Sequence, residues 1–196
     1  MSGDMGQLYA DMVGSTLANV EETFARIDVA ELQTAGKRLW QSRRVFTLGV
    51  GVNHSNARNF TYLASTGMTE FHAIPRAGSV ATDDLAWCDE RDALIAMTSK
   101  PYRTEVIEAV HVAREQGMTV IGISDSPASP IVTAAQHGFV VGVETPQFFP
   151  SSVATIAVLE TLLSFVIAAA SGTVVDRVAR FHQRRHDLGI YVEDGT

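Results

Sequence analysis

The segment ALIAMTSKPYRTEVIEAV, residues 93–110, combines a buried strand, a polar turn and the start of a helix. Its first five residues are all apolar, which is typical of a strand that is covered on both faces of a sheet. The turn that follows places hydroxyls and cations directly before a helical pattern. This pattern predicts a helix over 103–116 that ends before Gly117. Strand, turn and helix in this order form the repeating unit of a parallel α/β sheet.

The same unit recurs along the chain. Residues 53–65 have a helical pattern between the first two apolar runs, and residues 8–40 form one or two amphipathic helices. We therefore predict a three-layer α/β/α sandwich around a five-stranded parallel sheet, with an N-terminal helical segment (1–43) packed on a domain of residues 44–192. The predicted strands are 44–49, 70–74, 93–98, 119–124 and 139–143.

Composition narrows the possible functions. The chain has 196 residues, of which 46% are hydrophobic and 19% charged, and this suits one folded domain. Its net charge of -7 argues against a nucleic-acid surface, because binding to phosphate backbones needs clustered Lys and Arg. We therefore predict that this chain alone does not bind DNA.

The location of the protein is predicted from its cysteine count and its apolar runs. The single Cys88 excludes an internal disulfide and fits a reducing cytoplasm. The N-terminal residues lack the pattern of a signal peptide. The longest apolar run, 153–170, contains Glu160, so we predict a buried or subunit-interface helix and no membrane span. A cytoplasmic protein is expected.

The loop GVGVN, residues 49–53, follows the first strand. Gly51 lets the backbone turn tightly and approach a ligand, while Asn53 and Ser55 either cap the next helix or contact a bound group. A dinucleotide site is excluded, because His54 replaces the third glycine of that motif and no acidic residue ends the second strand. A tight turn with a helix cap explains the glycines equally well.

The loop after the third strand suits an anion. Thr98 and Ser99 offer hydroxyls, Pro101 suits a first helical turn, and free amides at 102 and 103 would face the ligand. Lys100 or Arg103 would add charge-assisted bonds. The alternative is that Ser99 only caps the helix and that both cations are solvated.

The loop after the fifth strand joins Glu144 to a helix whose predicted caps are Ser151 or Ser152. Two aromatic residues in this loop, Phe148 and Phe149, would be costly to expose unless they pack on a ligand or a second subunit.

The histidines do not have metal-ligand spacing. His182 and His186 are four residues apart, but neighbouring cations and the lack of a third ligand favour an exposed charged helix. No metal and no cofactor are predicted.

These loops, in this order, resemble those of the sugar isomerase (SIS) domain, and more narrowly of the effector domain in the MurR/RpiR family of bacterial transcriptional regulators. The resemblance covers about residues 21–191 and rests on four segments. These are GVGVN, TSKPYRTEVIEAV, VIGISDSPASP and PQFFPSSVATIAVLE.

The resemblance implies a flavodoxin-like SIS fold that forms a dimer or a dimer of dimers and binds a phosphosugar at the carboxyl ends of its strands. The chain departs from the family where SIS domains commonly have Ser in place of Asn53 and a Ser-Gly phosphate turn in place of Lys100 and Pro101. The ligand residues that this prediction assigns are Gly51, Asn53, His54, Ser55, Thr98, Ser99, Arg103, Ser151 and Ser152.

Three functions follow from this resemblance. The favoured one is a sensor of a phosphorylated sugar or related metabolite, the effector-binding part of a regulator whose helix-turn-helix is not among these residues. The second is an aldose-ketose isomerase of sugar phosphates, with Glu144 and His182 as candidates for proton transfer. The third is a dimerisation unit that uses residues 153–170 and the N-terminal helices. Whether the chain is free-standing or a fragment stays open.

Overall fold

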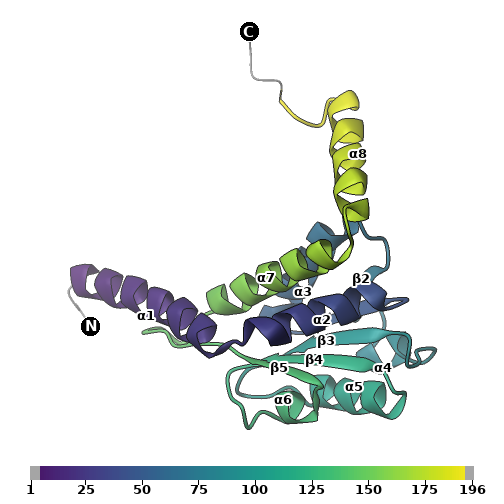
Figure 1. Cartoon of the computed structure of the whole chain (residues 1–196). Coiled ribbons are helices and arrows are strands. Elements are labelled where there is room, and N and C mark those ends of the chain that lie inside the picture. Colours follow the sequence, from purple (N-terminus) through teal and green to yellow (C-terminus); the bar gives the residue numbers. More distant parts are fainter. Residues whose placement is uncertain (1–4, 193–196) are drawn as a thin grey trace.

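The computed structural model describes residues 5–192 and contains a parallel sheet between two layers of helices (Figure 1). The elements, in chain order, are α1 (Met5–Arg26), α2 (Val29–Gln41), β1 (Val45–Gly49), α3 (Val52–Ser65), β2 (Phe71–Ile74), α4 (Ala81–Asp84), β3 (Ala93–Met97), α5 (Thr104–Glu115), β4 (Thr119–Ser124), α6 (Pro130–Ala134), β5 (His137–Val140), α7 (Val153–Ala169) and α8 (Thr173–Asp187).

The five strands are all parallel and lie in the order β2-β1-β3-β4-β5. The strands β1 and β3 are buried at every position, as their unbroken apolar runs predict. Because β2 and β5 are the outer strands, each has one free edge. The predicted three-layer sandwich is confirmed.

Each face of the sheet has its own hydrophobic core. One core lies between the sheet and α2, α3 and α7, and it includes Phe60, Ile121 and Leu162. The other lies between the sheet and α4, α5 and α6, and it includes Leu48 and Val110. Neighbouring positions along a strand point to opposite faces, so a continuous apolar strand supplies both cores.

The N-terminal pattern forms two helices. Asp28 caps α2, where its Oδ1 accepts a hydrogen bond from the N–H of Ala30 at 2.9 Å. The helix then buries Leu32 and Leu39 against the core. In contrast, α1 extends from the body, and its buried residues are polar (Figure 1).

Two predicted boundaries are wrong. The fifth strand was expected over 139–143 but runs over His137–Val140. Val141 still donates to the carbonyl of Ser124 in β4 at 2.9 Å, but the N–H groups of Gly142 and Glu144 bond to α1 instead of to the sheet. The fifth helix starts at Thr104, so Pro101 precedes the helix and does not belong to its first turn. The remaining strand ends differ from the prediction by at most one residue.

The two C-terminal helices differ in burial. The apolar helix α7 packs in the core, as predicted for residues 153–170, whereas α8 projects from the body (Figure 1). Within residues 5–192, no single helix is long and apolar enough to cross a bilayer. Only α7 and α8 taken together meet that criterion, and they are bent by 111°.

Candidate functional site

The strand order brings the two predicted ligand loops together. In a sheet of order 2-1-3-4-5, the chain passes from β1 to β2 on one side and continues through β3, β4 and β5 on the other. The order therefore reverses between β1 and β3, and ligands of such sheets bind beside this switch point at the carboxyl ends of the strands. Gly49, the last residue of β1, is in register with Met97, the last residue of β3. The loops 50–51 and 98–103 therefore leave the sheet side by side.

The first loop needs its glycines. A Cβ on Gly49 would lie 2.0 Å from the carbonyl oxygen of Asn53, so the strand end can approach α3 only without a side chain. Gly51 has a φ of 60°, a left-handed value that glycine adopts without strain. This turn directs the N-terminus of the 14-residue helix α3 toward the switch point. The positive end of a helix favours an anion there.

The side chains of this loop do not cap α3. Asn53 is buried, and its Oδ1 accepts a hydrogen bond from Asn56 Nδ2 at 3.0 Å. Ser55 donates its hydroxyl to the carbonyl of Val52, also at 3.0 Å. Of the two alternatives for Asn53 and Ser55, the helix cap is therefore wrong, because both groups bond within the helix. His54 and Ser55 are exposed at the start of α3.

Two buried hydroxyls, those of Thr98 and Ser124, hold the second loop by hydrogen bonds. Thr98 is 2% exposed, and its Oγ1 accepts a hydrogen bond from the N–H of Arg103 at 3.2 Å. Its carbonyl accepts a 2.6 Å bond from the hydroxyl of Ser124, which ends β4. The sequence prediction did not assign a role to Ser124, although a hydroxyl that ends a buried strand is a signal for one.

The bond from Arg103 to Thr98 corrects the anion-turn prediction in part. The amide of Arg103 is occupied by Thr98 and does not face outward as a free donor. Ser99 does not cap the helix either, because Arg103 holds the N-cap position. Ser99 is half-buried, and its hydroxyl has no hydrogen bond to any residue in 5–192, so it is available to a ligand.

The two cations of the loop differ. The Arg103 guanidinium bonds to Glu105 Oε1 at 2.8 Å and 3.1 Å, and both side chains are at least half exposed. Such an exposed pair contributes little to stability, so a ligand could displace it. Lys100 is exposed, and no residue of the described chain pairs with it.

The helix α1 holds the segment after β5. Asn19 is buried and makes two hydrogen bonds to the backbone of Glu144. Its Nδ2 donates to the carbonyl at 2.6 Å, and its Oδ1 accepts from the N–H at 3.0 Å. One turn later, Thr23 Oγ1 accepts from the N–H of Gly142 at 2.8 Å. The sequence prediction missed this pair, whose signal is two polar residues four apart on a helix.

The loop that follows is closed at its base. The N–H of Ser151 donates to the carbonyl of Val143 at 3.0 Å. Ser152 is the N-cap of α7, but its side chain does not bond to that helix, whereas Ser151 Oγ accepts from the N–H of Val153 at 3.4 Å. Of the two predicted caps, Ser151 therefore makes a weak one and Ser152 makes none.

The two candidates for proton transfer are not brought together. Glu144 is exposed beside α1, and His182 is exposed on α8, where its Nδ1 lies 3.1 Å from the Tyr191 hydroxyl. The 17-residue helix α7 separates the loop that follows Glu144 from α8, and a helix of this length spans about 25 Å. Within residues 5–192, no three His, Cys, Asp or Glu side chains cluster as metal ligands.

The opposite end of the sheet contains a charge cluster that stabilises the fold. Asp92 precedes β3 and accepts hydrogen bonds from Arg43 at 2.6 Å and Arg44 at 2.8 Å. Burial would raise the pKa of Asp92, but these bonds dominate and lower it to about 2. Burial also raises the pKa of Cys88 to about 11, which disfavours the nucleophilic thiolate.

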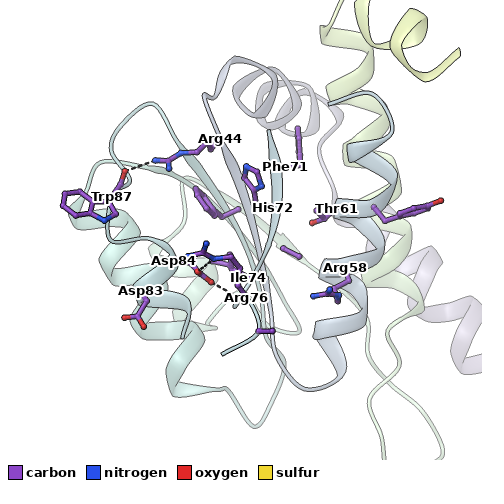
Figure 2. A pocket seen from close by; sticks show the side chains of 14 residues that line it. Arg44, Arg58, Thr61, Phe71, His72, Ile74, Arg76, Asp83, Asp84 and Trp87 are labelled. Carbon is purple, nitrogen blue, oxygen red and sulfur yellow. Dashed lines mark hydrogen bonds and ion pairs between the residues drawn. The ribbon is translucent and has the colours of Figure 1, made fainter. Parts of the chain in front are cut away.

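A groove of about 900 Å³ lies along the free edge of β2 (Figure 2), and none of its lining residues belongs to the loops 50–51 or 98–103. Its lining includes Arg58 from α3, His72 from β2, and Trp87 from the segment after α4. The sequence prediction noted only that no acidic residue ends this strand, and it assigned no role to Arg76, which follows the strand.

Comparison with known proteins agrees with this architecture. The sequence model of the SIS domain family matches residues 38–165. The arabinose 5-phosphate isomerase KdsD of Pseudomonas aeruginosa is 28% identical over 130 residues, which are 66% of this chain, and the chain spans only 37% of that relative's length.

Two solved structures share the fold. The sugar isomerase domain of the RpiR transcription factor from Sphaerobacter thermophilus has a TM-score of 0.82 and 21% identity, with 90% of this chain and 99% of that one covered. The Vibrio vulnificus NanR protein in complex with ManNAc-6P has a TM-score of 0.77 and 18% identity, with 94% and 72% covered.

Proposed function

Because the chain belongs to the SIS domain family, we propose that it binds a phosphorylated sugar at the β1/β3 switch point and senses it for a transcriptional regulator. The observation that carries this proposal is the register of Gly49 with Met97, which sets the N-terminus of α3 beside the hydroxyls of the second loop. The helix N-terminus suits the phosphate anion, and the hydroxyls suit the sugar.

In this proposal each loop has a distinct role. Gly51, Asn53, His54 and Ser55 belong to the α3 end, whose dipole favours the phosphate. The N–H groups of Asn53 and His54 already donate to the carbonyls of Val50 and Gly51, so the exposed His54 and Ser55 side chains supply the direct contacts. Ser99 donates its hydroxyl to the ligand, and Thr98 with Ser124 keeps the loop in shape. The Arg103 guanidinium exchanges its hydrogen bonds to Glu105 for bonds to the anion.

The remaining parts of the proposal concern the assembly. Of the N-terminal segment predicted over 1–43, residues 1–4 lie outside the described residues. The described part packs as helices on the SIS domain of residues 44–192, and the bonds of Asn19 to Glu144 support this. The protein forms homodimers in the cytoplasm, and the exposed apolar residues of α1, among them Leu8, Tyr9 and Leu17, suit a subunit contact. The loop with Ser151, Ser152 and the exposed Phe148 then closes the site.

Thermal unfolding in the presence of sugar phosphates tests the proposal. N-acetylmannosamine 6-phosphate and arabinose 5-phosphate are the first probes, with inorganic phosphate and the free sugars as controls. A ligand at about 100 times its Kd stabilises the folded state by about 2.7 kcal/mol, which raises the Tm by about 5 to 11 °C.

The matched variants are Ser99→Ala and Ser65→Ala. Both remove one hydroxyl, but Ser65 is an exposed residue at the far end of α3. We expect Ser99→Ala to reduce the ligand-induced shift while Ser65→Ala keeps it. If no sugar phosphate at millimolar concentration shifts the Tm, the proposal is wrong.

A second candidate function is isomerisation of a sugar phosphate, favoured by the likeness to arabinose 5-phosphate isomerase. It requires a base, and the position of Glu144 after β5 makes it the candidate, with His182 contributed by a second copy. Incubation of arabinose 5-phosphate in D₂O would reveal solvent-proton exchange, and Glu144→Gln should abolish it. Absence of exchange in the parent protein excludes this function.

A further inference from the structure

The edge strand β2 leaves backbone groups without partners. The N–H of Val45 donates to the carbonyl of Glu70 at 2.9 Å, and Val45 is in register with Phe71. Parallel strands bond through alternate residues, so the N–H and C=O groups of Phe71 and Ala73 point away from β1. Within residues 5–192 these groups have no hydrogen-bond partner.

Each face of this free edge has a wall. On one face, Phe71 packs edge-on against Phe60, with ring centroids 6.0 Å apart, and α3 continues the wall with Arg58 and Tyr62. On the other, His72 packs on Phe46 at 5.7 Å. Figure 2 shows Arg58 and Thr61 on one side of the strand and Trp87 on the other. The edge is therefore the floor of a groove that an extended chain can enter.

The second wall holds an exposed aromatic on a fixed backbone. Trp87 is 88% exposed, although the carbonyl of the same residue accepts a 2.8 Å hydrogen bond from Arg44 Nη2. The Arg44 guanidinium also lies 5.4 Å from the Phe46 ring centroid, so this wall is stacked and rigid. Trp, Tyr and Arg are the residue types that dominate binding energy at protein interfaces, and all three line this groove.

The charged side chains of the groove differ between its two walls. Three arginines and two aspartates line it, but Arg44 pairs with Asp92, which lies outside the groove, and Asp83 on the Trp87 side pairs with no described residue. The Asp84 carboxylate accepts two hydrogen bonds from Arg76, one from the side-chain Nε at 2.5 Å and one from the backbone N–H at 2.8 Å. On the α3 wall, Arg58 is exposed and forms no ion pair with any described residue. This wall therefore suits a carboxylate.

From these observations we infer that the β2 edge binds an extended segment of a partner protein that adds to the sheet as a sixth strand. Its backbone exchanges hydrogen bonds with Phe71 and Ala73. Alternate side chains point to opposite walls, so acidic residues meet Arg58 and apolar or aromatic residues meet Trp87.

A second copy of this chain suits the edge less well. A two-fold axis normal to the sheet would pair β2 with itself and keep both α3 helices on the same face. The exposed Arg58 of each copy would then lie on the same face of the joined sheet, and like charges brought together there are destabilising. The groove also lies apart from the switch point, so this inference is independent of the sugar-phosphate proposal.

The test uses an acetylated eight-residue peptide in which glutamate alternates with valine and phenylalanine. The control peptide has lysine in place of each glutamate. Calorimetric titration should give a Kd below about 1 mM for the acidic peptide and at least about tenfold weaker binding for the basic one. Amide exchange measured by NMR should slow at Phe71 and Ala73.

Two matched variants complete the test. Arg58→Glu should weaken the acidic peptide at least about tenfold, whereas Arg114→Glu, an exposed arginine on α5, should not. The inference is overturned if the parent protein does not bind the acidic peptide saturably, if it binds both peptides equally, or if amide exchange at β2 is unchanged by the acidic peptide. Sedimentation velocity tests the other possible occupant of the edge, a second copy of this chain. If Arg58→Glu dissociates a dimer, the edge belongs to the second copy and the inference is also overturned.

Discussion

Replacement of Asn19 by alanine tests whether α1 is part of the domain. The Asn19 amide makes two hydrogen bonds to the backbone of Glu144, at 2.6 Å and 3.0 Å. A typical hydrogen bond contributes about 0.5 to 1.5 kcal/mol to stability, so their loss costs about 1 to 3 kcal/mol. For a chain of this size the Tm should fall by about 2 to 12 °C.

Urea denaturation followed by circular dichroism measures this loss, and amide hydrogen exchange locates it. Thr16→Ala is the control, because the Thr16 hydroxyl bonds only within α1, to the carbonyl of Met12 at 2.8 Å. Both variants gain similar helix propensity, so their difference isolates the contact with Glu144. Exchange of the Glu144 amide should accelerate in Asn19→Ala alone. Equal stability of the two variants, with unchanged exchange at Glu144, would refute the reasoning.

Three further predictions concern the sheet. The pKa of Asp92 is lowered to about 2, so its ion pairs stabilise the fold above the ordinary pKa, near 4, and this stabilisation is lost as the pH falls through 2. Asp92→Asn should thus cost at least about 2 kcal/mol at pH 6, with a smaller difference at pH 2.5, by urea denaturation. Gly49→Ala should destabilise by about 1 to 3 kcal/mol because its Cβ would clash with the first turn of α3. In Gly14→Ala the new Cβ meets nothing within 4 Å, so this control should be neutral or stabilising in the same denaturation assay. Ser124→Ala should cost about 1 kcal/mol and speed exchange in the loop after Thr98, since the 2.6 Å bond to its carbonyl is lost. Unchanged exchange there would mean that this bond does not hold the loop.

The fold was largely predictable because its signals are local. Unbroken apolar runs such as 93–97 indicate strands buried on both faces, and polar turns between them mark where each helix begins. The family resemblance rested on the same turns, and the match to the SIS domain over 38–165 confirms it. The sequence also indicated both loops of the candidate site.

The hydrogen bonds inside those loops could not be predicted in the same way. The pattern suggested that Asn53 and Ser99 cap helices, but each cap depends on a backbone geometry that the neighbouring strands impose. Thr98 and Ser124 are 26 positions apart, and only the pairing of β3 with β4 brings them within 2.6 Å.

By itself, the sequence determined the fold class, the family and the positions of the two candidate loops, because apolar periodicity and turn residues act over short stretches of chain. Only the tertiary structure decided which strands are neighbours and which edges stay free. It joined Asn19 to Glu144 across 125 positions, and it gathered Arg58, His72 and Trp87 into a groove that no contiguous motif encodes. Such contacts depend on chain crossovers, which a pattern along one segment does not specify.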